Sequence, residues 1–194
     1  MAQIPSLRRS WIIIVGSGAP AAEVDNAALI AQNLRRKLNI AKSFPDTFPG
    51  LATLVKNCNV ITVGGPAANP YTVLLNDFTE PKYDFTVVRE KTADETWAEY
   101  ITSGGIVMRG FKVKDVAYAF VKHRGILCSG QQPGNKLRPL SVMHVGGRLF
   151  EDTCTMTQAF IDGAEPGYYE CIWPDPPDPT CAACPVAPTY TKVP

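Results

Sequence analysis

The sequence has no long apolar run and almost no excess of charge of either sign. No apolar stretch approaches the roughly 18–20 residues that a membrane-spanning helix needs, so we expect no transmembrane segment. Nineteen basic residues are balanced by 18 acidic ones, which gives a formal net charge of +1. A chain without a basic excess lacks the attraction that holds proteins on nucleic acids, so we expect no nucleic-acid contact.

Side chains suited to catalysis or metal binding are also scarce. The only two histidines are His123, which we place in a turn, and His144, which we place in a long loop, and we expect both to be solvated. Motifs of serine hydrolases, P-loop proteins and zinc proteases are absent. Glu151 and Asp152 are interpreted as solvated charges or charges that start a helix. We therefore predict a protein that is not an enzyme and has no catalytic residues, no cofactor and no metal.

Cysteine, in contrast, is abundant, and its even number is high for a reducing compartment. The candidate disulfide-forming residues are Cys58, Cys128, Cys154, Cys171, Cys181 and Cys184. This content indicates an oxidising location, or an organism in which intracellular proteins carry disulfides. Cys181 and Cys184 also have the spacing of half a zinc site. The sequence offers no second pair, so disulfides are favoured over zinc.

The N-terminal half has the pattern of strands that lead into helices. Residues 11–15 and 60–63 are apolar runs typical of buried strands, and each ends in a loop rich in glycine and proline. Helical patterns follow over residues 23–37 and from residue 71. This alternation indicates a parallel sheet with right-handed crossovers. The first run follows two basic residues, as in a signal peptide, but it is too short for one, so no export route is visible.

The second half is less regular. Residues 94–100 are interpreted as a short helix or a turn, and residues 131–150 as an insertion. We predict a hairpin of residues 116–122 with 125–128, a glycine-rich exit loop over 129–134, a helix over 152–161 and a strand over 169–173.

The composition changes near the C-terminus, where seven of the 17 prolines fall in the last 21 residues. We therefore divide the chain into an α/β domain, residues 1–173, and an extended Pro-rich, Cys-containing arm, residues 174–194. The fold class is α/β: a three-layer, Rossmann-like domain with a parallel or mixed sheet and a β-hairpin.

Three glycine-containing loops offer a binding site as an alternative. In open parallel sheets, ligands bind beyond the carboxyl ends of the strands. The cofactor-binding residues of this alternative would be Gly16, Gly18, Gly64, Gly65 and Gly130. Residues 16–21 fit the dinucleotide pattern G-x-G-x-x-A, but Pro20 removes a hydrogen-bond donor and Glu23 would face the pyrophosphate. Tight strand-to-helix turns are the favoured interpretation.

Three segments together resemble archaeal surface-layer (S-layer) proteins. Residues 12–24 resemble that family's first strand, loop and Ala-rich helix, and the sequence VITVGGPAAN at residues 60–69 resembles its "VVGGP-x-x-N" segment. Residues 125–130 and 151–153 are similar to its late strand and the helix start that follows. The resemblance implies an α/β assembly module without catalysis, in which the Gly-Pro turns are architectural.

These observations predict a structural subunit that assembles with copies of itself into a surface layer, an extracellular filament or an archaeal virion. Its location would be extracellular or on a cell or virion surface. The candidate interface residues are Trp97, Tyr168, Tyr169 and Trp173, for each of which core packing is at least as good an interpretation. The alternative hypothesis is a small-ligand- or nucleotide-binding protein that uses the strand-exit loops.

Overall fold

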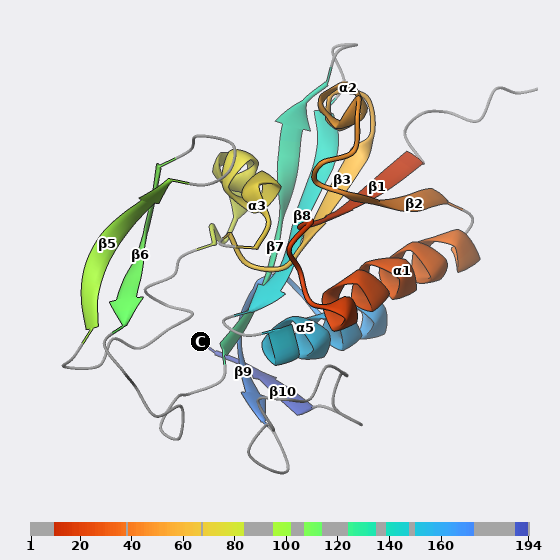
Figure 1. Cartoon of the computed structure of the whole chain (residues 1–194). Helices are drawn as coiled ribbons and strands as arrows, with labels where there is room; N and C mark the ends of the chain where they lie inside the picture. Colours follow the sequence, from red (N-terminus) through yellow and green to blue (C-terminus); the bar gives the residue numbers. More distant parts are fainter. Residues whose placement is uncertain are drawn as a thin grey trace, which may run out of the picture.

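A mixed β-sheet forms the centre of the computed structural model (Figure 1). The structure describes residues 10–37, 39–66, 68–83, 95–101, 107–113, 124–134, 139–147, 150–172 and 189–193. In this part of the chain, eight strands form one sheet with the order β10-β9-β7-β8-β3-β1-β2, and the short strand β4 pairs with β7. None of the described helices is long and apolar enough to cross a membrane.

The elements have the following bounds. The strands of the large sheet are β1 (Ser10–Val15), β2 (Ile40–Pro45), β3 (Asn59–Val63), β4 (Thr79–Glu80), β7 (Arg124–Pro133), β8 (Pro139–Gly147), β9 (Gly167–Ile172) and β10 (Thr189–Lys192). The helices are α1 (Ala21–Arg36), α2 (Leu51–Val55), α3 (Pro70–Leu74), the 3-10 helix η2 (Asn76–Phe78) and α5 (Phe150–Asp162). Strands β5 (Glu95–Ile101) and β6 (Val107–Val113) form a separate antiparallel pair.

The large sheet has a parallel and an antiparallel half. Strands β2, β1, β3 and β8 are parallel neighbours, whereas β7 pairs antiparallel with β8 and β9, and β9 pairs antiparallel with β10. The predicted α/β class and the mixed sheet are confirmed. Of the predicted Pro-rich arm, residues 174–188 and 194 lie outside the described residues, and its described end contains β10 at one edge of the sheet.

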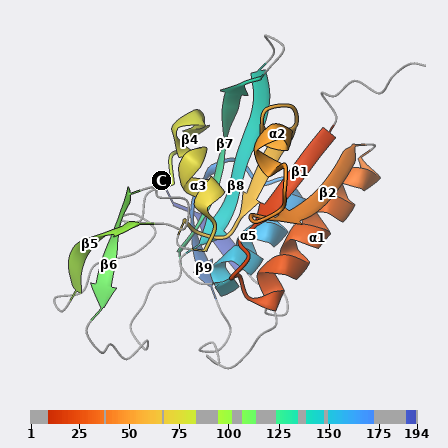
Figure 2. The ribbon, with the colours of Figure 1, turned by 45° about the horizontal axis from the view of Figure 1, so that its top comes forward.

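Helices cover both faces of the parallel half. Helices α1 and α5 lie side by side on one face (Figures 1 and 2). The buried helix side chains in this layer are Ala27, Ile30, Ala31 and Leu34 of α1 and Met156 and Ala159 of α5. They pack on the following strand residues: Ile13, Val15, Ala41, Ile61, Val63, Leu127, Val145, Tyr169 and Cys171. The opposite face packs against α2 and the end of α3 through Ile12, Ile14, Leu51, Val55, Cys58, Val60, Leu75 and Val142. The continuous apolar runs of β1 and β3 are explained by burial on both faces.

The outer edge of β2 is partly protected against further strand pairing. The Asp46 N–H donates to the Val15 carbonyl of β1. Backbone N–H and C=O groups of successive strand residues point to opposite sides, so those of Ala41, Ser43 and Pro45 point away from β1. Pro45 has no N–H, and its carbonyl accepts from the Phe48 N–H at 3.0 Å. The Ala41 carbonyl accepts from Arg35 Nη1 at 3.3 Å. Two of the outward carbonyls are therefore already used, and one position has no N–H to offer a foreign strand.

Several local predictions are wrong because tertiary pairing decides the structure. Strand β2 was not predicted, since its mixed sequence ends in a proline at a sheet edge. Residues 94–100 were interpreted as a helix or turn, but Glu95–Ile101 forms strand β5. The supposed insertion, residues 131–150, contains β8, which lies between β3 and β7 in the sheet.

The interpretation of residues 125–134 is also wrong. Both edges of residues 125–127 are occupied, by β8 on one side and β9 on the other, so a hairpin with residues 116–122 cannot form there. Residues 116–122 themselves lie outside the described residues. The supposed exit loop, residues 129–134, continues β7 as far as Pro133. Its actual hairpin partner is β8.

A chain of buried hydrogen bonds runs from β8 through β3 to α3. His144 lies opposite Thr62, and its Nδ1 is 2.5 Å from Thr62 Oγ1. The Thr72 hydroxyl lies 3.0 Å from Thr62 Oγ1 and 3.1 Å from the Gly64 carbonyl oxygen. Since a carbonyl only accepts, Thr72 donates to Gly64. The tautomer of His144 decides whether Nδ1 donates to Thr62 or accepts from it. Nε2 of His144 has no hydrogen-bond partner among the described residues.

The prediction that His144 is a solvated loop residue is therefore wrong, and its burial has a consequence for stability. Burial lowers the pKa of His144 from 6.5 to about 4. The unfolded chain takes up a proton in this window that the folded protein excludes. The free energy of unfolding should thus fall by about 3 kcal/mol as the pH drops from 6.5 to 4. Urea unfolding across the window measures this loss. His144→Asn, whose amide can replace Nδ1, should lack it; equal pH dependence in both proteins would contradict the assignment.

Candidate functional site

The candidate site lies at the carboxyl ends of β1 and β3, where the strand order reverses. Strand β1 leads through α1 to β2 on one side, and β3 lies on the other side of β1. In open α/β sheets this is the crevice in which ligands bind. The structure brings four of the five predicted glycines to this edge: Gly16, Gly18, Gly64 and Gly65.

The fifth glycine, Gly130, does not belong to the site. It lies within β7, opposite Val142 of β8 and Thr79 of β4. A Cβ at this position would come within 1.8 Å of the Phe78 carbonyl oxygen. Gly130 therefore permits the close approach of β4, and the prediction that it joins the other glycines is wrong.

A single amide side chain fills the crevice between the ends of β1 and β3. Asn69 is fully buried, and its Nδ2 donates to the carbonyls of Ile14 at 2.9 Å and Val63 at 3.0 Å. Its Oδ1 accepts from the Tyr71 N–H at 3.1 Å and so caps α3. The position where a ligand would contact both strand ends is thus taken by the protein's own side chain.

Two backbone N–H groups of the loop after β1 already have acceptors within the protein. The Ser17 N–H donates to Asp46 Oδ1 at 2.8 Å, and the Ala19 N–H donates to the Gly16 carbonyl at 3.1 Å. Pro20 has no N–H. A dinucleotide-binding loop presents its N–H groups to the pyrophosphate. Here an internal carboxylate, that of Asp46, stands in place of that anion.

The loop after β3 crosses directly over Gly16. A Cβ on Gly16 would lie 1.7 Å from the Ala68 carbonyl oxygen, whereas a Cβ on Gly18 would meet nothing within 4 Å. Gly16 is therefore required by the contact between the two loops and Gly18 is not. This contact fixes the backbone of Ala68, next to Asn69, against the loop after β1.

A buried carboxyl joins the two helices at this edge. The Glu23 side chain, in the first turn of α1, is 3% exposed and lies over Gly64, where a Cβ would come within 2.7 Å of Oε2. Burial raises the pKa of the Glu23 carboxyl, and a hydrogen bond with Thr153 of α5 lowers it by less. Gly64 has φ +94°, a conformation that favours glycine in any case. Oε2 has no hydrogen-bond partner among the described residues.

The N-terminal halves of α1 and α5 share a second polar contact. Asn26 Nδ2 lies 3.2 Å from Cys154 Sγ, one helical turn beyond the Glu23 contact. Glu151 and Asp152 begin α5 as predicted, but they are 5% and 0% exposed, so the expectation of solvated charges is wrong. Acidic side chains at a helix N-terminus interact favourably with the helix dipole. At α5 these acidic side chains are Glu151 and Asp152, which belong to the protein itself.

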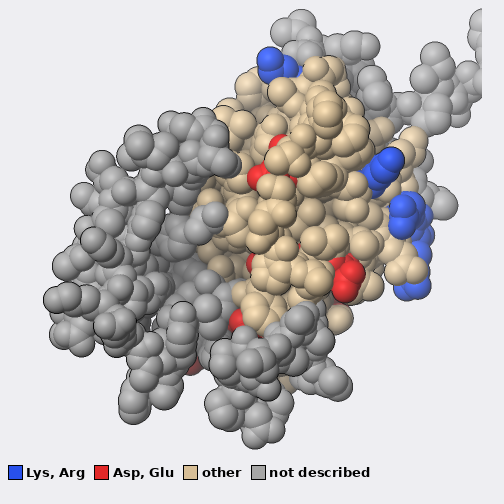
Figure 3. Space-filling model, viewed as in Figure 1, with Lys and Arg blue, Asp and Glu red and all other residues tan. Residues whose placement is uncertain are grey.

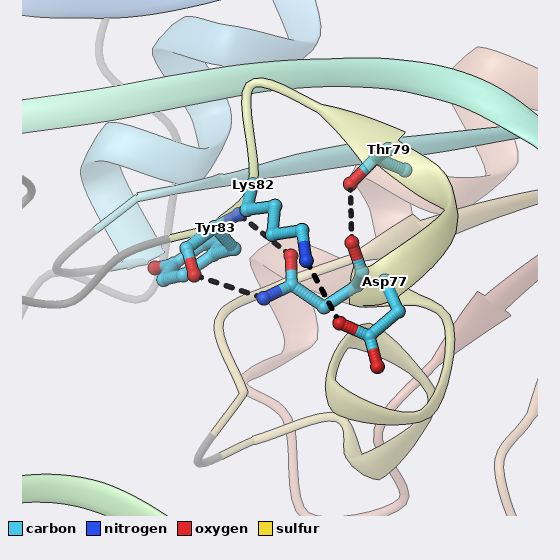
Figure 4. Close-up of polar contacts among 5 residues, drawn as sticks. Asp77, Thr79, Lys82 and Tyr83 are labelled. Carbon is cyan, nitrogen blue, oxygen red and sulfur yellow. Dashed lines mark hydrogen bonds and ion pairs between the residues drawn. The ribbon is translucent and has the colours of Figure 1, made fainter.

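Tyr83 closes the site on the side of β8. Its hydroxyl donates to the Gly147 carbonyl at 2.8 Å, and its ring contacts Gly65 and Gly146. The segment that carries it is held by Asn76, whose side chain accepts from the Tyr83 N–H, and by an exposed pair of Lys82 with Asp77 at 3.0 Å (Figure 4). Tight packing against glycine backbone thus leaves no room for a bulkier group beside Tyr83.

The six cysteines do not form the predicted set of disulfides. Cys58, Cys128 and Cys171 are reduced and lie inside the core, each in a different region. Burial raises the thiol pKa of Cys58 and Cys128, which keeps them protonated and poorly reactive. Cys154 is disulfide-bonded. Cys181 and Cys184 lie outside the described residues, and no group of three metal-binding side chains occurs in the described part of the chain.

The four candidate interface aromatics have different positions. Tyr169 is buried in the core, where its ring packs edge-on against Tyr190 at 5.7 Å. Tyr168 is partly buried, and its hydroxyl donates to the Lys82 carbonyl at 2.6 Å. Trp97 lies in β5, opposite Phe111 of β6, and Trp173 lies outside the described residues. Tyr169 is thus explained by core packing.

Comparison with known proteins gave no relative: no family model and no curated protein matches the chain.

The contact at Gly16 can be tested with a matched pair of variants. Gly16→Ala should destabilise the protein by about 2–4 kcal/mol, because its methyl group displaces the Ala68 peptide. Gly18→Ala introduces the same methyl group into open space and should change the free energy of unfolding by less than about 0.5 kcal/mol. Thermal and urea unfolding of the two variants measure the difference, and equal stabilities would contradict the close approach.

The burial of Glu23 predicts a pH-dependent cost with the opposite sign to that of His144. Because the folded pKa is raised, the unfolded chain ionises first, and stability is lost as the pH rises from 4.5 through the folded pKa. Glu23→Gln should therefore gain stability over the wild type as the pH rises, with the smallest difference at acidic pH. Asp25→Asn, an exposed neighbour, is the control. A stability difference that does not change with pH would show that the carboxyl ionises freely.

Proposed function

We propose that this protein is a non-enzymatic structural subunit that assembles with copies of itself into a surface layer, an extracellular filament or a virion. The observation that carries the proposal is the filled crevice at the ends of β1 and β3. Asn69, Asp46 and the Ala68 peptide use the space and the hydrogen-bonding groups that a ligand would need. Glycines at this edge then serve close packing, as expected of a rigid building block.

The finer architecture belongs to the same proposal. The parallel strands β2, β1 and β3, with α1 on one face and α2 on the other, support a three-layer, Rossmann-like arrangement. The Pro-rich arm would contact neighbouring copies. Its described end, strand β10, pairs with β9, which would anchor the arm on the domain. The resemblance to S-layer proteins favours a location on a cell or virion surface.

The proposal is tested by imaging the full-length protein. Negative-stain microscopy at increasing concentration, with calcium and at elevated temperature, should show sheets, filaments or regular particles. Particles of the size of a single chain under all these conditions would contradict the proposal.

A thermal-shift screen with nucleotides tests the alternative, a ligand-binding protein. We expect no change in melting temperature, because two donors of the loop after β1 are already used and the Asn69 side chain occupies the strand ends. A concentration-dependent rise would instead support the nucleotide-binding hypothesis.

A further inference from the structure

The outer face of α1 combines exposed apolar side chains with opposite charges at its two ends. Val24 and Leu29 are 47% and 48% exposed, high values for apolar residues of a helix that is packed on a sheet. Ala28 lies beside them and is also exposed. Figure 3 shows this face, with blue atoms gathered at the far right of the molecule and a largely tan surface between them and the nearest red group.

The charges are arranged in line with the apolar residues. Asp25, Leu29, Gln32 and Arg36 follow one another at intervals of four, three and four residues, and all four are exposed. This spacing places them on one stripe of the helix, with Asp25 and Arg36 about 16 Å apart along the axis. Neither Asp25 nor Arg36 forms an ion pair with another described residue.

Such a stripe is complementary to itself only in the antiparallel orientation. A second copy turned by a two-fold axis places its Arg36 opposite Asp25 and its Asp25 opposite Arg36, with the two Leu29 side chains near the axis. A parallel copy would bring like charges together. The antiparallel arrangement also opposes the two helix dipoles favourably.

We propose that the α1 face is a docking surface for a second copy of this chain, through an isologous, antiparallel α1–α1 contact. The inference rests on the proposed self-assembly and names one of its contacts. An isologous contact closes on itself, so a layer or filament needs at least one further contact.

The expected association is weak. Helix α1 has 16 residues, about 24 Å in length, so its outer face alone buries less surface than a standard protein interface. We expect a dissociation constant of about 10–100 μM for the pair, which added salt should raise.

A charge-reversal cycle on the full-length protein tests the contact by sedimentation velocity over about a hundredfold range of concentration. Asp25→Arg alone and Arg36→Asp alone each place like charges opposite one another and should raise the dissociation constant on the order of tenfold or more. The double variant restores opposite charges and should regain the wild-type association. The matched controls are Glu80→Arg and Lys56→Asp, which change the charge equally at exposed positions away from α1.

The outcomes separate this contact from the general proposal. If both single variants associate like the wild type, or if the double variant is not restored, the α1 contact is wrong, while sheets or filaments in the microscope would still support self-assembly. If the wild type remains monomeric in sedimentation, the α1 contact is overturned. Self-assembly fails as well only when microscopy also shows single chains. Loss in the two single variants alone, with recovery in the double variant, supports the contact.

Discussion

One buried amide holds the centre of the fold together. Asn69 binds the carbonyl ends of β1 and β3 simultaneously, and its own backbone follows the loop that crosses Gly16. Removing the amide would leave two buried carbonyls without donors and the N-terminus of α3 without its cap, costs of about 1–3 kcal/mol for each unsatisfied group. Thr72, three residues after Asn69, donates to the Gly64 carbonyl. The same loop therefore also positions α3 against the end of β3.

The groups that other α/β proteins use to bind ligands contact the protein's own side chains here. The groups that would serve a bound anion are the helix N-termini, the loop N–H groups and the strand-end crevice. In this chain they face Glu23, Asp46 and Asn69, all supplied by the protein itself. Each of these internal contacts fixes one element against another, which makes the fold rigid. The burial of the Glu23 carboxyl, in contrast, lowers the stability of the folded state where this group must ionise. Such a balance agrees with the structural role proposed above.

The parts that sequence could predict are those whose signal is local. The runs of β1 and β3 and the periodicity of α1 and α5 follow from burial of one or both faces, and all four elements were predicted near their observed bounds. Strand β8 was missed because a polar His144 stands in a strand buried on both faces, and the partner that satisfies it, Thr62, is 82 residues away. Asn69 before a proline signals a helix cap, but no local pattern reveals which carbonyls its amide binds.

The partly protected edge of β2 matters for the assembly proposed above. Copies at high local density would be exposed to pairing between the edges of their sheets, the route by which strands build amyloid. The proline at the end of β2 and the arginine that covers the Ala41 carbonyl remove part of the hydrogen bonding that such pairing needs at this edge. In the proposed assembly, contacts at this edge would then form through side chains, whose shape and charge select the partner, and such contacts would be reversible enough for errors in packing to be corrected.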